Sequence, residues 1–279
     1  MMRIYKTDKS IIVEEGGICF LSPEQNWDQL INHDDLYDWL GHQVSKLQPA
    51  GDLPWLEALS IQAPIGSQEL WAAGVTYLRS KTARMEESKE SGGASFYDKV
   101  YEAERPELFF KASGGKVRGP NARVRIRRDS SWNVPEPELT LVVTSSGKIV
   151  GYTIGNDMSS RSIEGENPLY LPQAKVYDGS AALGPCIWVP GKEIPSSTLI
   201  AMTIHREGIN VFEGQVTIDQ MKRGHDELVE FLYRENSFTY GSYLMTGTCI
   251  VPGNDFTLAS GDIVRITIDG IGTLINTVE

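Results

Sequence analysis

The sequence predicts a β-rich protein of mixed α/β class, with a small N-terminal α+β domain over residues 1–65 and a larger domain over residues 66–279. Within residues 27–47, apolar side chains recur at intervals of three and four, the spacing that places them on one face of a helix. After Trp71, apolar residues gather in short runs separated by glycine and proline, which is typical of β-strands. Prolines and glycines in residues 49–67 interrupt both patterns and indicate a linker.

Each domain has its own expected elements. In the first, the apolar run at residues 11–13 predicts a strand before a turn at Gly16-Gly17, and one or two helices follow. In the second, apolar runs of strand length occupy residues 139–143, 149–154, 201–204 and 263–268. Asp269-Gly270 separates the last of these runs from another at residues 271–275, and this dipeptide is a strong hairpin signal. We therefore expect a closed or sandwiched sheet in the larger domain.

Helical patterns return twice in the second domain, at residues 80–89 and 219–230. In the latter, Met221, Leu228 and Phe231 are expected to face the sheet. The polar segment 79–104 carries charges of both signs and a Ser-Gly-Gly-Ala-Ser run. It is interpreted either as a solvated surface helix and loop or as a lid over a site.

The composition argues against several classes of protein. The 37 acidic and 26 basic residues give a formal net charge of −11, and no basic run could follow a phosphate backbone. Nucleic acids and anionic membranes are therefore not expected as partners. Cys19, Cys186 and Cys249 show no CxxC spacing, which favours reduced core residues over disulfides or a thiolate zinc site. Because neither a leader pattern nor 18 consecutive apolar residues occurs, we expect a cytoplasmic protein.

Two glutamates, Glu136 and Glu138, stand at the start of a predicted strand with Pro137 between them. Side chains two apart on a strand share a face, and Pro137 favours an extended backbone at Glu136. Taken alone, two glutamates at this spacing usually lie on an exposed strand face and have no function. Asp157 follows the next apolar run, and a third carboxylate close to the pair makes an all-oxygen site suited to Mg²⁺ or Mn²⁺. The four histidines show no HxxxH or HExxH spacing, which disfavours a zinc hydrolase.

A series of short motifs runs through the larger domain. In chain order they are Leu108-Phe109-Phe110-Lys111, Glu136-Pro137-Glu138-Leu139, Asn156-Asp157-Met158-Ser159-Ser160-Arg161, Ala174-Lys175, Leu183-Gly184-Pro185, Thr246-Gly247-Thr248, Gly261-Asp262 and Gly270-Ile271-Gly272. This order and spacing resembles the fumarylacetoacetate hydrolase family, from about Trp71 to the C-terminus. Ser162 departs from the pattern, because the family usually has an aspartate after the arginine. Within the family, segments 74–80, 97–107 and 164–175 are similar to dehydratases of 2-keto-3-deoxy-D-arabinonate.

The resemblance implies a distorted β-barrel-like fold of rolled mixed sheets. It also implies a Mg²⁺ ion, with Mn²⁺ as an alternative, held by Glu136, Glu138 and Asp157, and a small 2-oxo acid substrate that chelates this ion. Lys175 matches the family's active-site lysine and is expected in proton transfer or leaving-group stabilisation. Glu107 is expected as a general base, or else as a surface carboxylate. We expect Lys111, Arg161 and Thr248 to bind the substrate, although each could instead have a structural role. Arg79 and Arg84, on the polar segment, are expected to close over the substrate.

The implied reaction is the dehydration of a 2-keto-3-deoxy sugar acid to 2,5-dioxopentanoate through a metal-stabilised enolate. A C–C bond hydrolase or decarboxylase of acylpyruvate or oxaloacetate-like acids is the alternative, because it passes through the same enolate. A third possibility is a protein that binds a metal or a sugar acid without turnover. Family members commonly assemble into oligomers, so a homodimer or homotetramer is expected.

Overall fold

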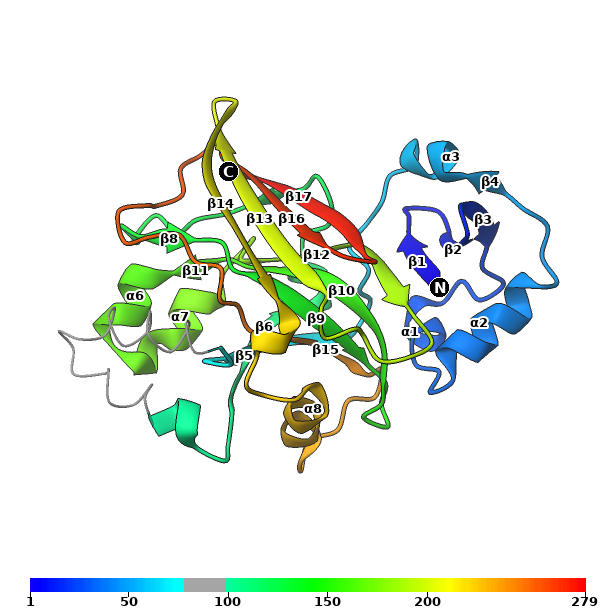
Figure 1. Ribbon diagram of the computed structural model, residues 1–279, viewed down its shortest axis with the longest axis horizontal. Coiled ribbons are helices and arrows are strands. Elements are labelled where there is room, and N and C mark those ends of the chain that lie inside the picture. The colour runs from blue at the N-terminus through cyan, green and yellow to red at the C-terminus, as the bar shows by residue number, and fades with distance from the viewer. Residues whose placement is uncertain (78–98) are drawn as a thin grey trace.

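The framework of the computed structural model, which describes residues 1–77 and 99–279, is two large β-sheets (Figure 1). The larger sheet has ten described strands in the order β4-β3-β2-β1-β12-β10-β9-β15-β5-β6. These strands are β1 (Met2–Lys6), β2 (Ile11–Glu15), β3 (Ile18–Leu21), β4 (Gly51–Asp52), β5 (Glu69–Gly74), β6 (Glu107–Ser113), β9 (Pro137–Val143), β10 (Ile149–Asp157), β12 (Ala181–Val189) and β15 (Ser242–Met245). Its neighbours are antiparallel except for β15 and β5, which makes the sheet mixed.

The second sheet has five described strands in the order β14-β13-β16-β17-β7. They are β7 (Arg123–Val124), β13 (Leu199–Arg206), β14 (Ile209–Thr217), β16 (Ile263–Ile268) and β17 (Gly272–Val278). β16 and β17 form the antiparallel hairpin predicted at Asp269-Gly270. A third, two-stranded sheet pairs β8 (Asn133–Val134) with β11 (Ser159–Ser160).

The described helices are short and lie around the sheets (Figure 1). They include α1 (Trp27–Leu30), α2 (Leu36–Val44), α3 (Leu53–Glu57), α6 (Arg161–Glu166), α7 (Leu171–Lys175) and α8 (His225–Tyr233), with 3₁₀ turns η1 (Gly114–Lys116), η2 (Pro168–Tyr170) and η3 (Ile218–Gln220), and residues 99–102 are also helical. The helical periodicity at residues 27–47 is thus confirmed as two helices, α1 and α2. No helix in the described ranges is long and apolar enough to cross a membrane.

The central strands are buried on both faces, because each face packs against a different layer. Leu139 of β9 lies in one core with Ile266 of the five-stranded sheet. Val142, on the opposite face of β9, lies in a second core that includes Leu40 of α2. A strand covered on both sides shows a continuous apolar run instead of alternation, which accounts for the sequence of β9.

The expectation of rolled mixed sheets is confirmed, and of the two arrangements left open the sandwiched one is found. Each described sheet has free ends, at β4 and β6 in the larger and at β14 and β7 in the smaller, so neither closes into a barrel. β1 pairs with β12, so the N-terminal strands extend the larger sheet. The domain boundary at residue 65 stays a prediction.

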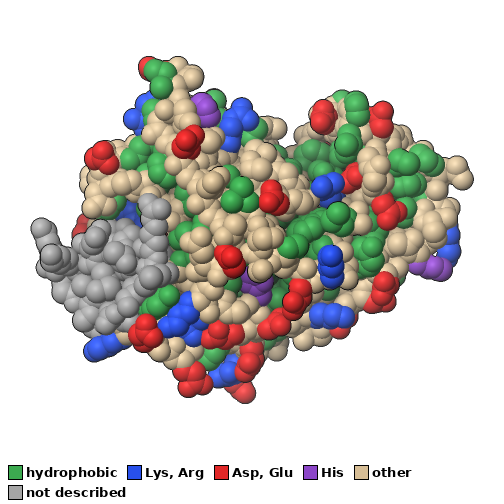
Figure 2. Space-filling view, viewed as in Figure 1, with side chains coloured by type: hydrophobic (Ala, Val, Ile, Leu, Met, Phe, Trp, Pro, Cys, Tyr) green, Lys and Arg blue, Asp and Glu red, His purple; other side chains and the backbone are tan. Residues whose placement is uncertain are grey.

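Acidic and basic side chains are interspersed on the face shown in Figure 2.

The helix expected at residues 219–230 was placed too early. α8 begins at His225, because residues 218–220 form a 3₁₀ turn and Gly224 precedes the helix, where its N–H donates to Glu227 Oε2 at 3.2 Å. Leu228 is buried as expected, and Met221 is partly buried and packs against the same core. Phe231 does not face the sheet: its ring contacts the guanidinium groups of Arg105 and Arg234, at 5.5 and 4.2 Å from the ring centre.

Candidate active site

The register of β9 and β10 brings three carboxylates together. Pro137 pairs with Asn156, and the next residues, Glu136 and Asp157, exchange both backbone hydrogen bonds, at 3.1 and 2.9 Å. Glu138 lies two residues from Glu136 and therefore on the same face. One oxygen from each carboxylate lies within 4.8 Å of the others, and all three side chains are buried. Among residues 1–77 and 99–279, this is the one cluster of potential metal ligands that could hold an ion.

The Glu138 carboxylate is held by the loop after β15. Gly247 donates its backbone N–H to Glu138 Oε2 at 2.6 Å. Gly247 has a φ of +92°, and a Cβ there would lie 2.1 Å from Thr76 Oγ1, so this close approach requires glycine. Burial, together with the neighbouring Asp157 and Glu136 carboxylates, raises the pKa of Glu138 well above its usual range. A cation between the three groups would relieve this repulsion.

A buried ammonium lies against two of the carboxylates. Lys175, at the end of α7, places Nζ 2.6 Å from Glu136 Oε2, 3.0 Å from Asp157 Oδ2 and 2.5 Å from Ser159 Oγ. The ring of Phe109 lies on another side of this ammonium, with its centre 5.7 Å away. Lys175 is therefore buried beside two of the candidate ligands and is not an exposed lysine, and its part in proton transfer stays a prediction.

Arg161 joins the same group of charges from the start of α6. Its guanidinium forms an ion pair with Glu136, and its Nε lies 3.8 Å from Glu164 Oε2. Ser162, in place of the family's usual aspartate, has Oγ 2.9 Å from Ser130 Oγ. The carboxylate that supports Arg161 locally is therefore Glu164. Our sequence reasoning missed this residue, although its spacing of three residues from Arg161 on a helix was a usable signal.

The donor set fits a divalent metal ion. All three candidate ligands are carboxylates, the hard oxygen donors that Mg²⁺ and Mn²⁺ prefer. The buried charged side chains gathered here carry one more negative than positive charge when all are ionised: Glu136, Glu138, Asp157 and Glu164 against Lys111, Lys175 and Arg161. A dication would turn this excess into a single positive charge, which suits an anionic substrate.

A small cavity of about 20 Å³ opens onto these carboxylates. Its lining residues are Ala73, Gly74, Val75, Phe109, Glu136, Glu138, Asp157, Arg161, Lys175, Gly247 and Thr248. The metal-binding candidates, Lys175, Arg161 and Thr248 thus share one space, although they come from four separate stretches of the chain. The cavity has room for about one ion or water molecule, next to a group that can move a proton.

Comparison with known proteins identifies the family of this chain. The family model for the fumarylacetoacetate (FAA) hydrolase C-terminal domain matches residues 77–279. The chain belongs to the fumarylacetoacetate hydrolase family. It is 49% identical over 216 residues to a probable 2-keto-3-deoxyxylonate dehydratase of Haloferax volcanii, covering 77% of this chain and 73% of the relative. It is 46% identical over 224 residues to the 2-dehydro-3-deoxy-D-arabinonate dehydratase of Saccharolobus solfataricus, covering 79% and 75%.

Solved structures of dehydratases match over nearly the whole chain. A 2-keto-3-deoxy-D-arabinonate dehydratase complexed with magnesium and 2,5-dioxopentanoate superposes with a TM-score of 0.84, at 35% identity, covering 100% of this chain and 98% of the other. A hexagonal crystal form of 2-keto-3-deoxyarabinonate dehydratase gives a TM-score of 0.83 at 35% identity, covering 99% and 98%. The likeness therefore includes the N-terminal strands and helices as well as the region that the family model matches.

Two further residues expected in the site lie at its edge or within it. Glu107 begins β6 opposite Gly74, and a Cβ on Gly74 would lie 2.1 Å from Glu107 Oε2. Its carboxylate thus lies over a glycine that lines the cavity. Thr248 lines the cavity directly, and its Oγ1 accepts a hydrogen bond from the Ile250 N–H at 3.1 Å. These positions are compatible with the proposed roles of both residues.

The predicted lid falls mostly outside the described residues. Arg79, Arg84 and the helix expected at residues 80–89 all lie there. The described end of the segment, residues 99–104, is bound to the stretch before α8: Lys222 Nζ donates to the Tyr101 carbonyl at 2.6 Å, and Arg223 donates to the Glu104 carbonyl at 2.9 Å. The choice between a lid and a solvated helix stays a prediction.

Lys111 lies behind Asp157 and is completely buried. Its ammonium forms an ion pair with Asp157 and donates to the carbonyls of Met158, at 3.0 Å, and Lys175, at 2.5 Å. Burial lowers the pKa of Lys111 below its usual value, and the Asp157 carboxylate offsets only part of this effect. Because Lys111 is not among the residues that line the cavity, this geometry favours the structural alternative, in which Lys111 orients Asp157.

We therefore expect Lys111→Met to destabilise the fold by about 3 kcal/mol, because it leaves two carbonyls buried without their donor and removes one of the two cations that contact Asp157. Urea unfolding measures this loss. The KM for substrate in the folded fraction is expected to change little. A rise in KM of about tenfold or more with unchanged stability would instead favour direct substrate binding.

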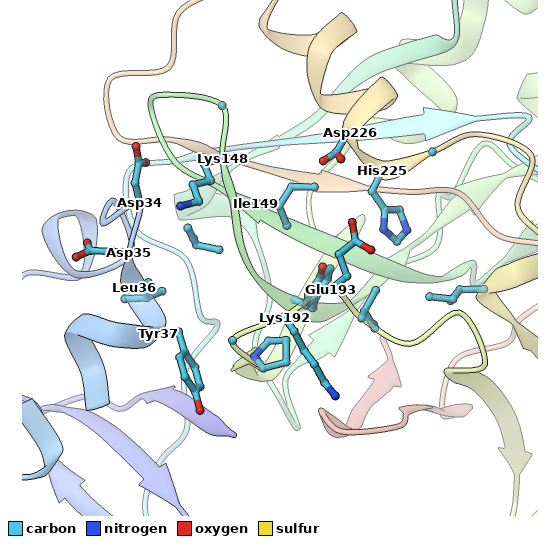
Figure 3. Close-up of a pocket in the computed structure, with 18 of the residues that line it drawn as sticks. Asp34, Asp35, Leu36, Tyr37, Lys148, Ile149, Lys192, Glu193, His225 and Asp226 are labelled. Atoms are coloured by element: carbon cyan, nitrogen blue, oxygen red, sulfur yellow. The ribbon is translucent and has the colours of Figure 1, made fainter. Parts of the chain in front are cut away.

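A second and much larger cavity, of about 900 Å³, shares no lining residue with the first (Figure 3). In Figure 3, residues at the start of α2, among them Asp35 and Tyr37, lie on one side, and His225 at the start of α8 lies on the other. Its described lining contains no cluster of three metal-ligating side chains. The smaller cavity is therefore the better candidate for catalysis, despite its size.

His225 gives the fold a predicted dependence on pH. Burial lowers the pKa of His225, against the opposing effect of Asp226 and Glu193. A lowered folded-state pKa means that stability is fully present above the unfolded value, near 6.5, and falls as pH decreases from there through the folded value. We expect His225→Asn to lose less stability than the wild type between pH 7.5 and 5.5 in urea unfolding. Equal losses in the two proteins would contradict this.

Proposed function

We propose that this chain is a magnesium-dependent hydro-lyase that converts a 2-keto-3-deoxy pentonate, such as 2-keto-3-deoxy-D-arabinonate, to 2,5-dioxopentanoate. The observation that carries the proposal is one buried cavity in which Glu136, Glu138 and Asp157 converge beside the Lys175 ammonium. The family, the two dehydratase relatives and the magnesium- and product-bound neighbour support the same reaction.

The residues have distinct proposed roles. Glu136, Glu138 and Asp157 would hold the ion, which supplies a Lewis acid for the oxygens of a 2-oxo acid. Glu107 would take the proton from the substrate's C3, and the Lys175 ammonium would give a proton to the departing hydroxyl of C4. Arg161 and Thr248, which also line the cavity, would bind the substrate's carboxylate and hydroxyl groups. The reaction balances, because one proton from C3 and one hydroxyl from C4 leave as water and isomerisation with the C5 alcohol gives the aldehyde.

The charge count favours a substrate with a single carboxylate. With a dication present, the buried charged groups named above carry one net positive charge when all are ionised. A monocarboxylate such as a 2-keto-3-deoxy pentonate neutralises this charge, whereas an oxaloacetate-like dicarboxylate leaves an uncompensated negative charge in a buried site. The charge count thus supports the sugar acid over the oxaloacetate-like alternative.

A product screen tests the function. Purified protein is stripped with EDTA, dialysed, and assayed with and without Mg²⁺ on 2-keto-3-deoxy-D-arabinonate, acylpyruvate and oxaloacetate in one buffer. We expect Mg²⁺-dependent 2,5-dioxopentanoate, detected by NMR, and no pyruvate release. Pyruvate from either of the other two substrates would favour the hydrolase or decarboxylase. Metal binding without any product would favour a binding protein that lacks turnover.

We also propose that the enzyme works in the cytoplasm as a homodimer or homotetramer, as members of this family commonly assemble. Light scattering of the eluting protein measures the mass of the assembly directly. A mass equal to that of one chain would contradict this proposal.

A further inference from the structure

Glu164 links the two buried cations of the site. It lies on α6 one turn after Arg161, and Ser160 Oγ caps this helix by accepting from the Ile163 N–H at 3.3 Å. Residues three apart on a helix are neighbours, so Glu164 and Arg161 turn to the same side. Glu164 Oε1 lies 3.3 Å from Lys175 Nζ, and its Oε2 lies 3.8 Å from Arg161 Nε. The side chain is only 2% exposed.

The same two cations also share carboxylates with the proposed metal site. Lys175 contacts Glu136 and Asp157, and Arg161 contacts Glu136. When those carboxylates bind a divalent ion, less of their negative charge is left for Lys175 and Arg161. The ion also repels both cations, and a buried cation that loses its partner is costly. The cations therefore need an anion that lies outside the ligand set.

Glu164 meets this need. Among the ion pairs of the described residues, it is the one carboxylate outside the ligand set that contacts both Lys175 and Arg161. Its position on a short helix, away from the strands that carry the ligands, lets it keep these contacts without entering the metal site.

We propose that Glu164 is a positioning residue, which holds Lys175 and Arg161 in place beside the bound divalent ion and so makes metal binding compatible with proton transfer. This inference rests on the proposed metal site and on the role of Lys175, but not on the identity of the substrate.

Three variants test the proposal. Glu164→Gln keeps the shape of the side chain and removes its charge, Glu164→Asp keeps the charge on a shorter arm, and Glu166→Gln is the matched control, an exposed glutamate on the same helix. Mn²⁺ affinity is measured by electron paramagnetic resonance of the free ion, without substrate. Separate assays give kcat and KM at saturating Mg²⁺, and a thermal melt gives the folded fraction.

We expect Glu164→Gln to weaken Mn²⁺ binding by about tenfold and to lower kcat by about 10- to 100-fold, as for other groups that support metal ligands. KM is expected to change less, because Glu164 is not among the residues that line the cavity. Glu164→Asp should recover part of both losses, and Glu166→Gln should match the wild type.

The outcomes separate the alternatives. Wild-type Mn²⁺ affinity and kcat in folded Glu164→Gln, with only a lower melting temperature, would overturn the proposal in favour of a purely structural role. If Glu164→Gln does not fold, Glu164→Asp decides, with intermediate Mn²⁺ affinity supporting the proposal and wild-type affinity overturning it. Wild-type protein that binds Mn²⁺ but produces no 2,5-dioxopentanoate would contradict the proposed reaction alone, since the Mn²⁺ comparison still tests Glu164.

Discussion

Replacing Glu136 by glutamine is expected to reduce Mg²⁺-dependent turnover by on the order of 10³-fold, the effect of losing about 4 kcal/mol of charge stabilisation. Glu136 contributes one of the three converging carboxylates, and it also pairs with both Lys175 and Arg161. The amide is a weaker ligand for a hard cation, and it leaves both cations with one fewer anion. Turnover at saturating Mg²⁺ and Mg²⁺ affinity by calorimetry measure the two consequences separately.

The control for this variant is again Glu166→Gln, which removes the same charge from an exposed position. It should retain both Mg²⁺ affinity and turnover. Circular dichroism checks that Glu136→Gln is folded. A folded Glu136→Gln enzyme with Mg²⁺-dependent turnover within about threefold of the wild type would refute the assignment of the metal site.

Lys175→Met is expected to lower kcat by about 10²- to 10⁴-fold, the range for removing a general acid or base. Its ammonium lies within 3.0 Å of both Glu136 and Asp157, so it occupies the space next to the proposed ion. Removing a cation from the side of the ligands should leave Mg²⁺ affinity unchanged or increase it. The two variants therefore have opposite signatures, because Glu136→Gln loses the metal while Lys175→Met keeps it.

Lys175→Arg distinguishes a proton carrier from a fixed positive charge. Arginine stays protonated in proteins and does not release its proton to the departing hydroxyl. If Lys175 carries the proton, Lys175→Arg should be about as inactive as Lys175→Met. Recovery of most of the wild-type kcat by Lys175→Arg would show that only the charge is needed.

The convergence of the carboxylates was predictable in part. Period-two alternation and Pro137 placed Glu136 and Glu138 on one face, and the apolar runs on either side predicted the strands that carry the site. The pairing of Glu136 with Asp157 depends on the register of β9 and β10, which is set by their hydrogen bonds and by the turn between them. The order of the family motifs, and not the pattern of any single strand, indicated that Asp157 joins the two glutamates.

The start of α8 and the orientation of Phe231 were predicted wrongly, and each error has a local cause. α8 was expected six residues too early, because the apolar periodicity continued through residues that instead form a 3₁₀ turn before Gly224. Phe231 was expected to face the sheet, although the buried face of α8 is formed by Leu228, Val229 and Leu232. Its ring contacts two arginines, one of them on a distant segment, and helical spacing contains no information about such a partner.

The sequence by itself determined the strand-rich class, the hairpin at Asp269-Gly270, helices α1 and α2, and the shared face of Glu136 and Glu138, because these depend on residues close together in the chain. Only the tertiary structure decided that Lys111 lies behind Asp157 and that Glu164 joins Lys175 to Arg161. Charged side chains are usually exposed, so their burial cannot be read from composition. Burial of these charged side chains is possible because separate strands and helices bring opposite charges within about 4 Å of one another, where Coulomb attraction offsets part of the desolvation cost.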